Sequence, residues 1–304
     1  MNPSIDSKIP APSPSSAPFS WAWISIPDHQ GVVHVGGRIG AALGPAAAWR
    51  IFGRMSGRSP VRETLSGNHT AGPISEKIES NHREARAWVK RFQESHSRTV
   101  VVGGGHDLGF PHLQGVQDAI QTKLGRPARI GCINLDAHLD VRKPDPVITS
   151  GSPFYLALEA GVLRAEDFVE FGIQSHCNSR ALWNFIEDRG VKVIPMNVLR
   201  APGAATARFE DELKALSNRC DAIVVSLDLD CIEQASAPGV SAPQAEGFRP
   251  SDILEMVELS GKSDKVVSLG IFELNPLFDQ DDRTARIAAT AAWHFAESAL
   301  IEGH

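Results

Sequence analysis

The sequence predicts an α/β protein in which parallel strands alternate with amphipathic helices. From Trp21 onward, apolar runs of strand length alternate with longer amphipathic stretches, which is the pattern of repeated βαβ units. Most of these apolar runs are short and rich in β-branched residues, which favour strands. With 304 residues, 42% apolar and 22% charged, the chain has the composition and length of a globular protein with one large α/β domain.

The expected elements follow this alternation along the chain. The clearest strands are residues 99–103, 130–135, 168–173, 191–195, 222–227 and 266–271. Helices are expected at residues 74–95, 113–124, 180–189, 205–216, 250–259 and 284–302. Residues 1–19 are dominated by Pro, Ser and Ala, so we expect a mobile tail there, followed by a single domain of residues 20–304.

Charge, apolar runs and cysteines argue against several classes of protein. A net charge of −6 without a basic run gives no sign of nucleic acid or an anionic membrane as a partner. No apolar run approaches the roughly 18 residues that span a bilayer, and no charged leader with an apolar core begins the chain. The four cysteines form no C-x-x-C pair, as expected for thiols in a reducing compartment. We therefore expect a soluble, cytoplasmic protein.

Three clusters of histidine and aspartate follow three of the expected strands. The first is Gly103-Gly104-Gly105-His106-Asp107, where the glycines permit a tight turn that places His106 at the strand end. Taken alone, this cluster is more typical of a glycine-rich turn with a capping side chain than of a functional site. In open α/β sheets, ligands bind beyond the carboxyl ends of the strands, so clusters far apart in sequence can meet in one crevice.

The second and third clusters each place acidic groups two residues apart. After the strand at 130–135, the segment Asp136-Ala137-His138-Leu139-Asp140, if extended, turns its three polar side chains to one face. Asp228 and Asp230 follow the strand at 222–227 in the same way. Two carboxylates on one strand face repel each other unless a proton or a cation neutralises them, so this spacing indicates a metal site.

Together the clusters supply ligands for two divalent cations. Four aspartates carry the four negative charges that two such ions require, and two histidines add nitrogen ligands. A carboxylate-rich set without thiolate favours Mn²⁺ over a structural zinc, with Ni²⁺, Co²⁺ and Zn²⁺ as alternatives. Each cluster alone has a structural explanation, such as helix capping, but their shared chemistry and shared location indicate a metal centre.

In this order and spacing, G-G-G-H-D, D-A-H-x-D and S-x-D-x-D resemble the motifs of the arginase, agmatinase and formiminoglutamase superfamily. The resemblance extends from residues 36–38 and 44–45, through 237–243, to 273–276. It implies a three-layer α/β/α sandwich with a mainly parallel sheet and two Mn²⁺ ions. The implied metal ligands are His106, Asp136, His138, Asp140, Asp228 and Asp230. It also implies an assembly of three or six copies.

The resemblance further implies how these ligands are shared and what the ions do. Asp136 and Asp228 would bridge the ions, while the remaining ligands complete one coordination sphere each. A water between two cations loses a proton near neutral pH and becomes a nucleophile. Catalytic roles fall to Asp140 and to Glu273, which resembles the carboxylate that binds the substrate's guanidinium or amidinium group. An exposed charge at a strand end is the alternative for Glu273.

Several positions bear on the substrate, which we expect to be a small amidine or guanidino compound with a carboxylate. Arg142 suits a bidentate pair with a carboxylate, although a solvated loop arginine would have the same sequence. The stretch 149–154, with Ser150 and Ser152, resembles the S-G-T-P-F segment of formiminoglutamases, whereas arginases and agmatinases usually carry a proton-shuttling histidine at the position of Ser150. Asn178, near Gln174, also fits the formiminoglutamase pattern, with helix capping as its alternative.

The leading interpretation is therefore a formimidoylglutamase, which converts N-formimino-L-glutamate and water to L-glutamate and formamide in histidine degradation. A ureohydrolase of another guanidino acid is the second interpretation, and Ser150 argues against it. A deacetylase would normally show adjacent histidines, and the sequence contains no His-His pair. A noncatalytic metal-binding sensor or scaffold is the alternative from another class, against which the full ligand set and Glu273 argue.

Overall fold

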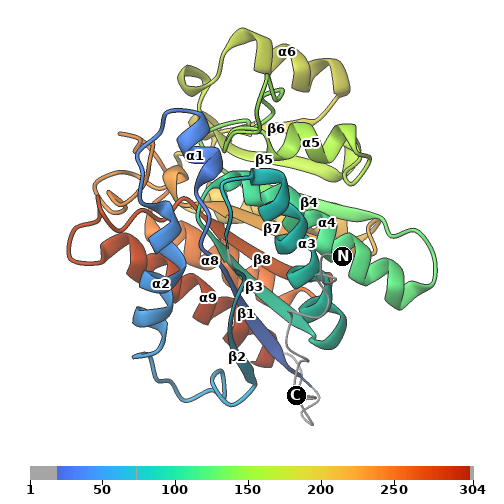
Figure 1. Cartoon of the computed structure of the whole chain (residues 1–304), viewed down its shortest axis with the longest axis vertical. Helices are drawn as coiled ribbons and strands as arrows, with labels where there is room; N and C mark the ends of the chain where they lie inside the picture. The colour runs from blue at the N-terminus through green and yellow to red at the C-terminus, as the bar shows by residue number, and fades with distance from the viewer. Residues whose placement is uncertain (1–18, 73, 302–304) are drawn as a thin grey trace.

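A computed structural model describes residues 19–72 and 74–301 of the chain. An eight-stranded, wholly parallel sheet has the strand order β2-β1-β3-β8-β7-β4-β5-β6 (Figure 1). The strands are β1 (Trp21–Ile26), β2 (Leu65–Thr70), β3 (Arg98–Gly103), β4 (Ile130–Leu135), β5 (Phe168–Ile173), β6 (Lys192–Pro195), β7 (Ala222–Asp228) and β8 (Val266–Phe272). The six strands expected from the sequence are all present, within one residue at each end.

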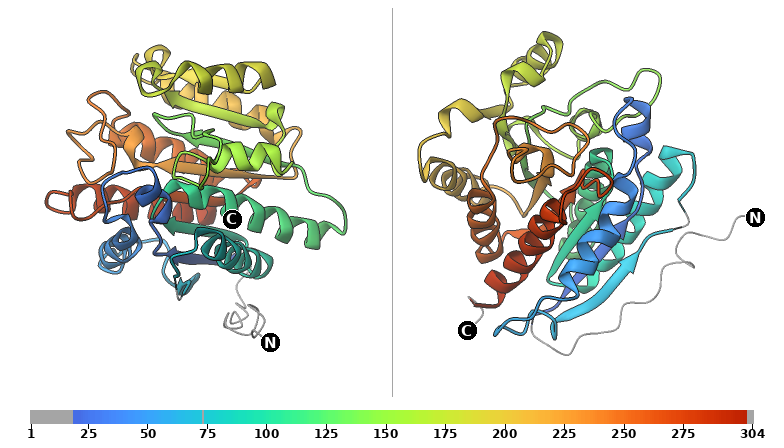
Figure 2. Two further views of the ribbon diagram at one scale, coloured as in Figure 1. Left: turned by 45° about the horizontal axis from the view of Figure 1, so that its top comes forward. Right: turned by 90° about the vertical axis from the view of Figure 1, so that its left-hand side faces the viewer.

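Helices cover both faces of this sheet, which makes the three-layer α/β/α sandwich (Figure 2). They are α1 (Gln30–His34), α2 (Gly44–Phe52), α3 (Ile78–Ser95), α4 (Gly109–Leu124), α5 (Pro153–Glu159), α6 (Arg180–Arg189), α7 (Ala204–Ser217), α8 (Pro250–Lys262) and α9 (Arg283–Ile301). Helices α3 to α6 pack on one face, and α2 and α7 to α9 pack on the other. None of the helices in the described ranges is long and apolar enough to cross a membrane.

Two apolar cores lie between the sheet and its helix layers because side chains alternate along each strand. In β3, Val100 and Val102 belong to the core beneath α2 and α7 to α9, whereas Val101 belongs to the core beneath α3 to α6. Strands buried on both faces therefore read as continuous apolar runs, which is why they were recognisable in the sequence. Phe19, the last residue of the expected tail, packs against the first of these cores. The rest of that tail lies outside the described residues.

The order of the strands places the segments that follow four of them side by side, at the carboxyl ends of the central strands. The chain forms β1 to β3, continues to β4, β5 and β6, and returns to insert β7 and β8 between β3 and β4. The carboxyl ends of β3, β8, β7 and β4 are thus neighbours at the centre of the sheet. The loops that follow these four strands carry the residues of the expected site.

Gly104 shows how tightly the loop after β3 is held. Its amide donates to the Ile26 carbonyl at 3.1 Å, and its own carbonyl accepts from the Glu273 amide at 2.8 Å. A Cβ at this position would lie 1.9 Å from the carbonyl oxygen of Asp28. Only glycine therefore allows β1, β3 and the loop after β8 to approach this closely.

Replacing Gly104 with alanine is expected to lower the free energy of unfolding, because backbone would have to move to admit the methyl group. Overpacking of this kind costs about 1–3 kcal/mol or more. Urea unfolding of Gly104→Ala should be compared with that of Gly72→Ala, since a Cβ on Gly72 would have no neighbour closer than 4.0 Å. Equal unfolding free energies for the two variants would contradict this account of the loop.

Candidate metal centre

All six expected ligands lie together at the carboxyl ends of the central strands. His106 begins the short 3₁₀ turn η3 (His106–Leu108) after β3, and the second cluster follows β4. Asp228 is the last residue of β7, and Asp230 lies in the next turn, η7 (Leu229–Cys231). Their nitrogen and carboxylate atoms form two sets, each with its atoms within 4.8 Å of one another.

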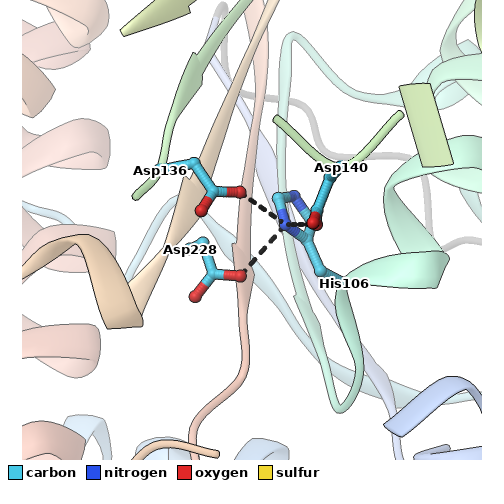
Figure 3. Close-up of side chains that lie close together, drawn as sticks. All are labelled: His106, Asp136, Asp140 and Asp228. Carbon is cyan, nitrogen blue, oxygen red and sulfur yellow. Dashed lines mark ion pairs between the residues drawn. The ribbon is translucent and has the colours of Figure 1, made fainter. Parts of the chain in front are cut away.

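The first set, which we call the His106 group, contains His106, Asp136, Asp140 and Asp228. His106 Nδ1 lies 3.1 Å from Asp136 Oδ2, 3.0 Å from Asp140 Oδ2 and 3.0 Å from Asp228 Oδ2 (Figure 3). The other ring nitrogen, Nε2, pairs with the Ser226 hydroxyl at 2.8 Å. Nδ1 is therefore the atom that faces the three carboxylates.

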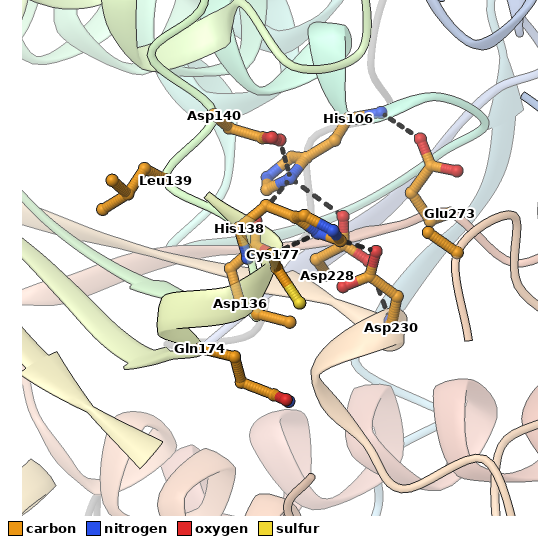
Figure 4. Close-up of polar contacts among 12 residues, drawn as sticks. His106, Asp136, His138, Leu139, Asp140, Gln174, Cys177, Asp228, Asp230 and Glu273 are labelled. Carbon is orange, nitrogen blue, oxygen red and sulfur yellow. Dashed lines mark hydrogen bonds and ion pairs between the residues drawn. The ribbon is translucent and has the colours of Figure 1, made fainter. Parts of the chain in front are cut away.

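The second set, which we call the His138 group, contains Asp136, His138 and Asp230. His138 Nδ1 lies 3.1 Å from Asp230 Oδ2 and 3.5 Å from Asp136 Oδ1 (Figure 4). Asp136 belongs to both groups, and it turns Oδ2 toward one group and Oδ1 toward the other. This is the geometry of a carboxylate that bridges two cations.

The described residues of the site fit a pair of divalent cations. One ring nitrogen cannot donate to three carboxylates at once, and His106 Nδ1 makes a well-directed hydrogen bond with none of them. Asp230 Oδ1 is likewise buried without a hydrogen-bond partner. Buried carboxylates at this spacing require positive charge, which cations between them would supply. The oxygen-rich donor set without thiolate suits Mn²⁺ or similar ions.

Burial and the crowding of the carboxylates shift the pKa values of several ligands upward. Burial raises the pKa of Asp228 well above its ordinary value, and the neighbouring charges of Asp230 and Asp136 add to this. Burial also raises the pKa of Asp230 to about 6, against the opposing effect of His138. Burial would lower the pKa of His138, but Asp230 and Asp136 raise it far above its ordinary value. Cation binding must therefore displace protons from this site.

The path of the chain through the second cluster differs from the sequence expectation. Residues 136–140 were expected to be extended, which would have aligned their polar side chains on one face; that was wrong. The strand ends at Leu135, because Asp136 Oδ1 accepts from the His138 amide at 2.7 Å and turns the chain. Asp140 lies in the left-handed region with φ 44°. The three ligands converge through this turn.

Asn178 holds the turned segment in place. Its Oδ1 accepts from the Leu139 amide at 2.8 Å, and its Nδ2 donates to the carbonyls of Ala137 at 3.1 Å and Gln174 at 2.9 Å. The structure thus places this amide against the backbone of residues 137–139, which carry the ligand His138. It does not cap α6, because the residue at that position is Ser179. Asn178 thus bonds to the residues on both sides of His138.

Glu273 follows β8 and lies beside the His106 group. Its φ of 65° is in the left-handed region, and its Oε1 accepts from the His106 amide at 3.0 Å (Figure 4). Its second oxygen, Oε2, is buried without a hydrogen-bond partner. Burial, together with the charge of Asp228, raises the pKa of Glu273 well above its ordinary value. The exposed strand-end alternative for this side chain is therefore wrong, since only 4% of Glu273 is exposed.

A cavity of about 250 Å³ opens above the two groups. Its lining includes His138, Asp140 and Glu273, together with Arg142 and Ser150 at the expected substrate positions. Ser152, also expected to contact substrate, is fully buried, and its hydroxyl bonds to Thr149 at 3.0–3.2 Å, so the structure does not place it in the cavity. The cavity thus joins the metal centre to Arg142.

Other parts of the lining were not assigned a role from the sequence. Residues 35–37 and Ser241 also line the cavity, and the Ser241 hydroxyl accepts from the Arg38 amide at 2.9 Å. A Cβ on Gly37 would lie 2.6 Å from that hydroxyl, so a larger residue here would displace the Ser241 side chain. The segments 36–38 and 237–243 had been noted only as part of a resemblance. Their proximity depends on tertiary contacts between distant loops.

Comparison with known proteins gives consistent results. The model of the arginase family matches residues 24–297. A formimidoylglutamase of Staphylococcus carnosus is 35% identical over 88% of this chain and 82% of its own length. The formimidoylglutamase of Klebsiella pneumoniae is 34% identical over 93% of this chain and 87% of its own. A Trypanosoma cruzi formiminoglutamase structure with Mn²⁺ superimposes with a TM-score of 0.81 at 28% identity, covering 96% of this chain and 99% of that one.

Substitutions at a shared and an unshared ligand should affect the two cations differently. Asp136→Asn should weaken both bound ions, because Asp136 belongs to both groups. Asp230→Asn should weaken one ion, because Asp230 belongs to the His138 group alone. Calorimetric titration of each chelator-treated variant with Mn²⁺ gives the number of ions bound. Weakening of only one ion by Asp136→Asn would show that Asp136 is not shared.

Proposed function

Because the chain belongs to the arginase family, we propose that it is a manganese-dependent formimidoylglutamase. It hydrolyses N-formimino-L-glutamate to L-glutamate and formamide. The observation that carries this proposal is the cavity that has Glu273 beside the paired histidine and aspartate groups and Arg142 in the same lining. Relatives named formimidoylglutamase, similar along nearly the whole chain, support the same substrate. The Trypanosoma cruzi formiminoglutamase structure, which contains Mn²⁺, supports Mn²⁺ as the cofactor.

The charges of the site match those of this substrate at its reacting end. Four aspartates balance two divalent cations, which leaves Glu273 as one further buried carboxylate in the described lining of the cavity. A formimino group is an amidinium cation and neutralises this remaining charge. Glu273 Oε1 is occupied by the His106 amide, whereas Oε2 has no partner among the described groups and is the oxygen that would accept from the amidinium. Glu273 thereby orients the electrophilic carbon over the centre.

The two cations, when bound, supply a water molecule that is an effective nucleophile near neutral pH. Asp140 is placed to accept a proton from this water. Asp140 Oδ2 faces His106, while Oδ1 lies on the other side, 3.6 Å from where a Cβ on Gly151 would be. This second oxygen is next to the cavity and would accept the proton and pass it to the departing nitrogen.

Arg142 matches the opposite end of the substrate. Among the described residues that line the cavity it is the one arginine or lysine, and it is exposed where the cavity meets solvent. Its guanidinium Cζ lies 3.7 Å from the Cβ position of Gly151, so it is on the Asp140 side of the opening. A planar guanidinium pairs with a carboxylate through two parallel hydrogen bonds. Glu273 and Arg142 therefore select a molecule that is cationic at one end and anionic at the other.

Ser150 separates this proposal from a guanidino-acid ureohydrolase. It lines the cavity at the position where, by the resemblance, arginases and agmatinases usually carry a proton-shuttling histidine. A serine hydroxyl does not ionise near neutral pH and cannot replace that imidazole as an acid–base group. Assembly into trimers or hexamers and a cytoplasmic location remain predictions from the sequence.

The substrate assignment is tested by product analysis with manganese-loaded protein. N-Formimino-L-glutamate, guanidinobutyrate, arginine and agmatine should be supplied in parallel, and formamide, urea and the free amine measured. We expect formamide and glutamate from the first compound and no urea from the others. Urea from a guanidino acid would keep the metal chemistry and overturn the substrate. Binding of these compounds without turnover would favour a metal-dependent sensor.

Removing the Arg142 guanidinium should weaken binding of acidic substrates. A hydrogen bond to a charged group contributes about 1.5–3 kcal/mol, so Arg142→Ala should raise KM for N-formimino-L-glutamate about 10- to 100-fold with kcat little changed. Lys143→Ala is the matched control, because Lys143 is an adjacent exposed cation that does not line the cavity. If both variants keep the KM of the parent protein, Arg142 does not bind the substrate carboxylate.

A further inference from the structure

A row of polar side chains crosses the sheet one level below the metal centre. Asn134 on β4 is in register with Glu170 on β5 and with Ser226 on β7. All three are almost completely buried, although their strands are otherwise apolar except for Asp228 at the end of β7. Ser226 bonds to His106, as described above. The roles of Asn134 and Glu170 remain to be explained, since neither lines the cavity.

Asn134 links the row to the ligand that both cation groups share. Its Nδ2 donates to Asp136 Oδ2 at 3.2 Å and to Glu170 Oε2 at 2.9 Å. With the amide reversed, its oxygen would face the ionised carboxylate of Asp136, and the hydrogen bond that Nδ2 donates to Glu170 Oε2 would be lost. Glu170 therefore fixes the rotation of the amide, so that one N–H points at Asp136.

The contact concerns one of the two oxygens of Asp136. Oδ2 receives the Asn134 hydrogen bond and lies 3.1 Å from His106 Nδ1. Oδ1 receives the His138 amide and lies on the side of the His138 group. A side chain of the sheet thus holds the Asp136 oxygen that faces the His106 group. The backbone of the turn after β4 holds the Asp136 oxygen that faces the His138 group.

We propose that Asn134, with its amide oriented by Glu170, is a positioning residue that secures the cation of the His106 group. It acts by holding Asp136 Oδ2 toward that cation through a directed hydrogen bond. Groups behind metal ligands commonly set ligand orientation and metal affinity in this way. The inference rests on the metal centre of the proposed function and is independent of which amidine is the substrate.

The pair is poorly suited to a purely stabilising role. Asn134 Oδ1 and Glu170 Oε1 are both buried without a hydrogen-bond partner among the described residues. Burial, together with the charges of Asp136 and Asp140, raises the pKa of Glu170 well above its ordinary value. A buried polar pair with unmet hydrogen-bonding groups costs free energy relative to apolar side chains of the same shape. Its effect is therefore expected in metal binding more than in folding.

The first test measures Mn²⁺ binding to chelator-treated full-length protein by calorimetry and by electron paramagnetic resonance. Asn134→Leu should weaken one of the two ions about 10- to 100-fold, as loss of groups behind metal ligands does. At limiting Mn²⁺, the resonance should change from that of a coupled pair to that of an isolated ion. Equal weakening of both ions, or no change in either, would overturn the proposal.

Combination with Asp230→Asn identifies which ion is affected. Asp230→Asn removes a ligand of the His138 group alone, so the ion that it keeps should be that of the His106 group. Adding Asn134→Leu to this background should weaken the remaining ion by the same 10- to 100-fold factor. If the remaining ion is unaffected, Asn134 acts on the other group and the proposal is wrong.

The role of Glu170 is tested by a conservative and a nonconservative replacement. Glu170→Gln retains an oxygen that accepts from Asn134 and should bind both ions within about threefold of the parent, whereas Glu170→Leu should weaken the His106 group ion about 10-fold or more. Similar losses in both variants, or in neither, would refute the positioning role of Glu170.

A matched control separates positioning from general damage to the sheet. Ser268 on β8 is also fully buried and polar, and its hydroxyl bonds to Thr99 and His112 rather than to a metal ligand. Ser268→Ala should change the unfolding temperature without changing Mn²⁺ affinity at either group. If it weakens Mn²⁺ binding as much as Asn134→Leu does, the effect of Asn134 is merely structural.

Discussion

The shared carboxylate of Asp136 is the constraint on which the rest of the site depends. Its two oxygens face different cation groups, and each oxygen is held by a different part of the fold. A bridging carboxylate has little freedom, because rotation that improves one metal–oxygen contact degrades the other. The hydrogen bonds from the sheet below and from the turn after β4 must therefore both be compatible with one orientation of this side chain.

The parallel sheet meets that demand through its strand order. Four adjacent strands, β3, β8, β7 and β4, end at the same level, and each is followed by residues of the site. Gly104 lets the loop after β3 contact both β1 and the loop after β8, so the ligand loops brace one another through backbone hydrogen bonds. The positions of the ligand side chains are therefore fixed by the rigid strand ends as well as by the loops.

The sequence predicted the strands and helices whose pattern of apolar residues reflects their burial. The six strands expected were buried apolar runs, whereas β2 (Leu65–Thr70) lies at the sheet edge and includes Gly67, Asn68 and His69, which do not form such a run. Strand β1 and the shorter helices α1, α2 and α5 were also missed. In α2 and α5, a proline in the first turn is typical of a helix start, but the prediction did not take it into account. The predicted start of α3, at residue 74, was too early, since that helix begins at Ile78.

At the site, ligand identity was readable because His and Asp after apolar strands are chemically unusual. The turn at Asp136 depends on a local hydrogen bond that the His138 amide donates to the Asp136 side chain, and residue spacing alone does not show whether it forms. The contact of Asn178 with this turn joins groups far apart in sequence. The same is true of Asn134, whose significance appears only when its neighbours in the sheet are known.

The hydrogen bond from the His106 amide to Glu273 has a thermodynamic consequence for the working enzyme. It ties the carboxylate assigned to the substrate to the backbone of a metal ligand, so occupancy of one site biases the conformation of the other. Such coupling is reciprocal: if the cation of the His106 group improves substrate affinity, substrate improves retention of that cation by the same factor. A cell short of manganese would then lose the ion first from idle molecules, and those engaged in turnover would keep it longest.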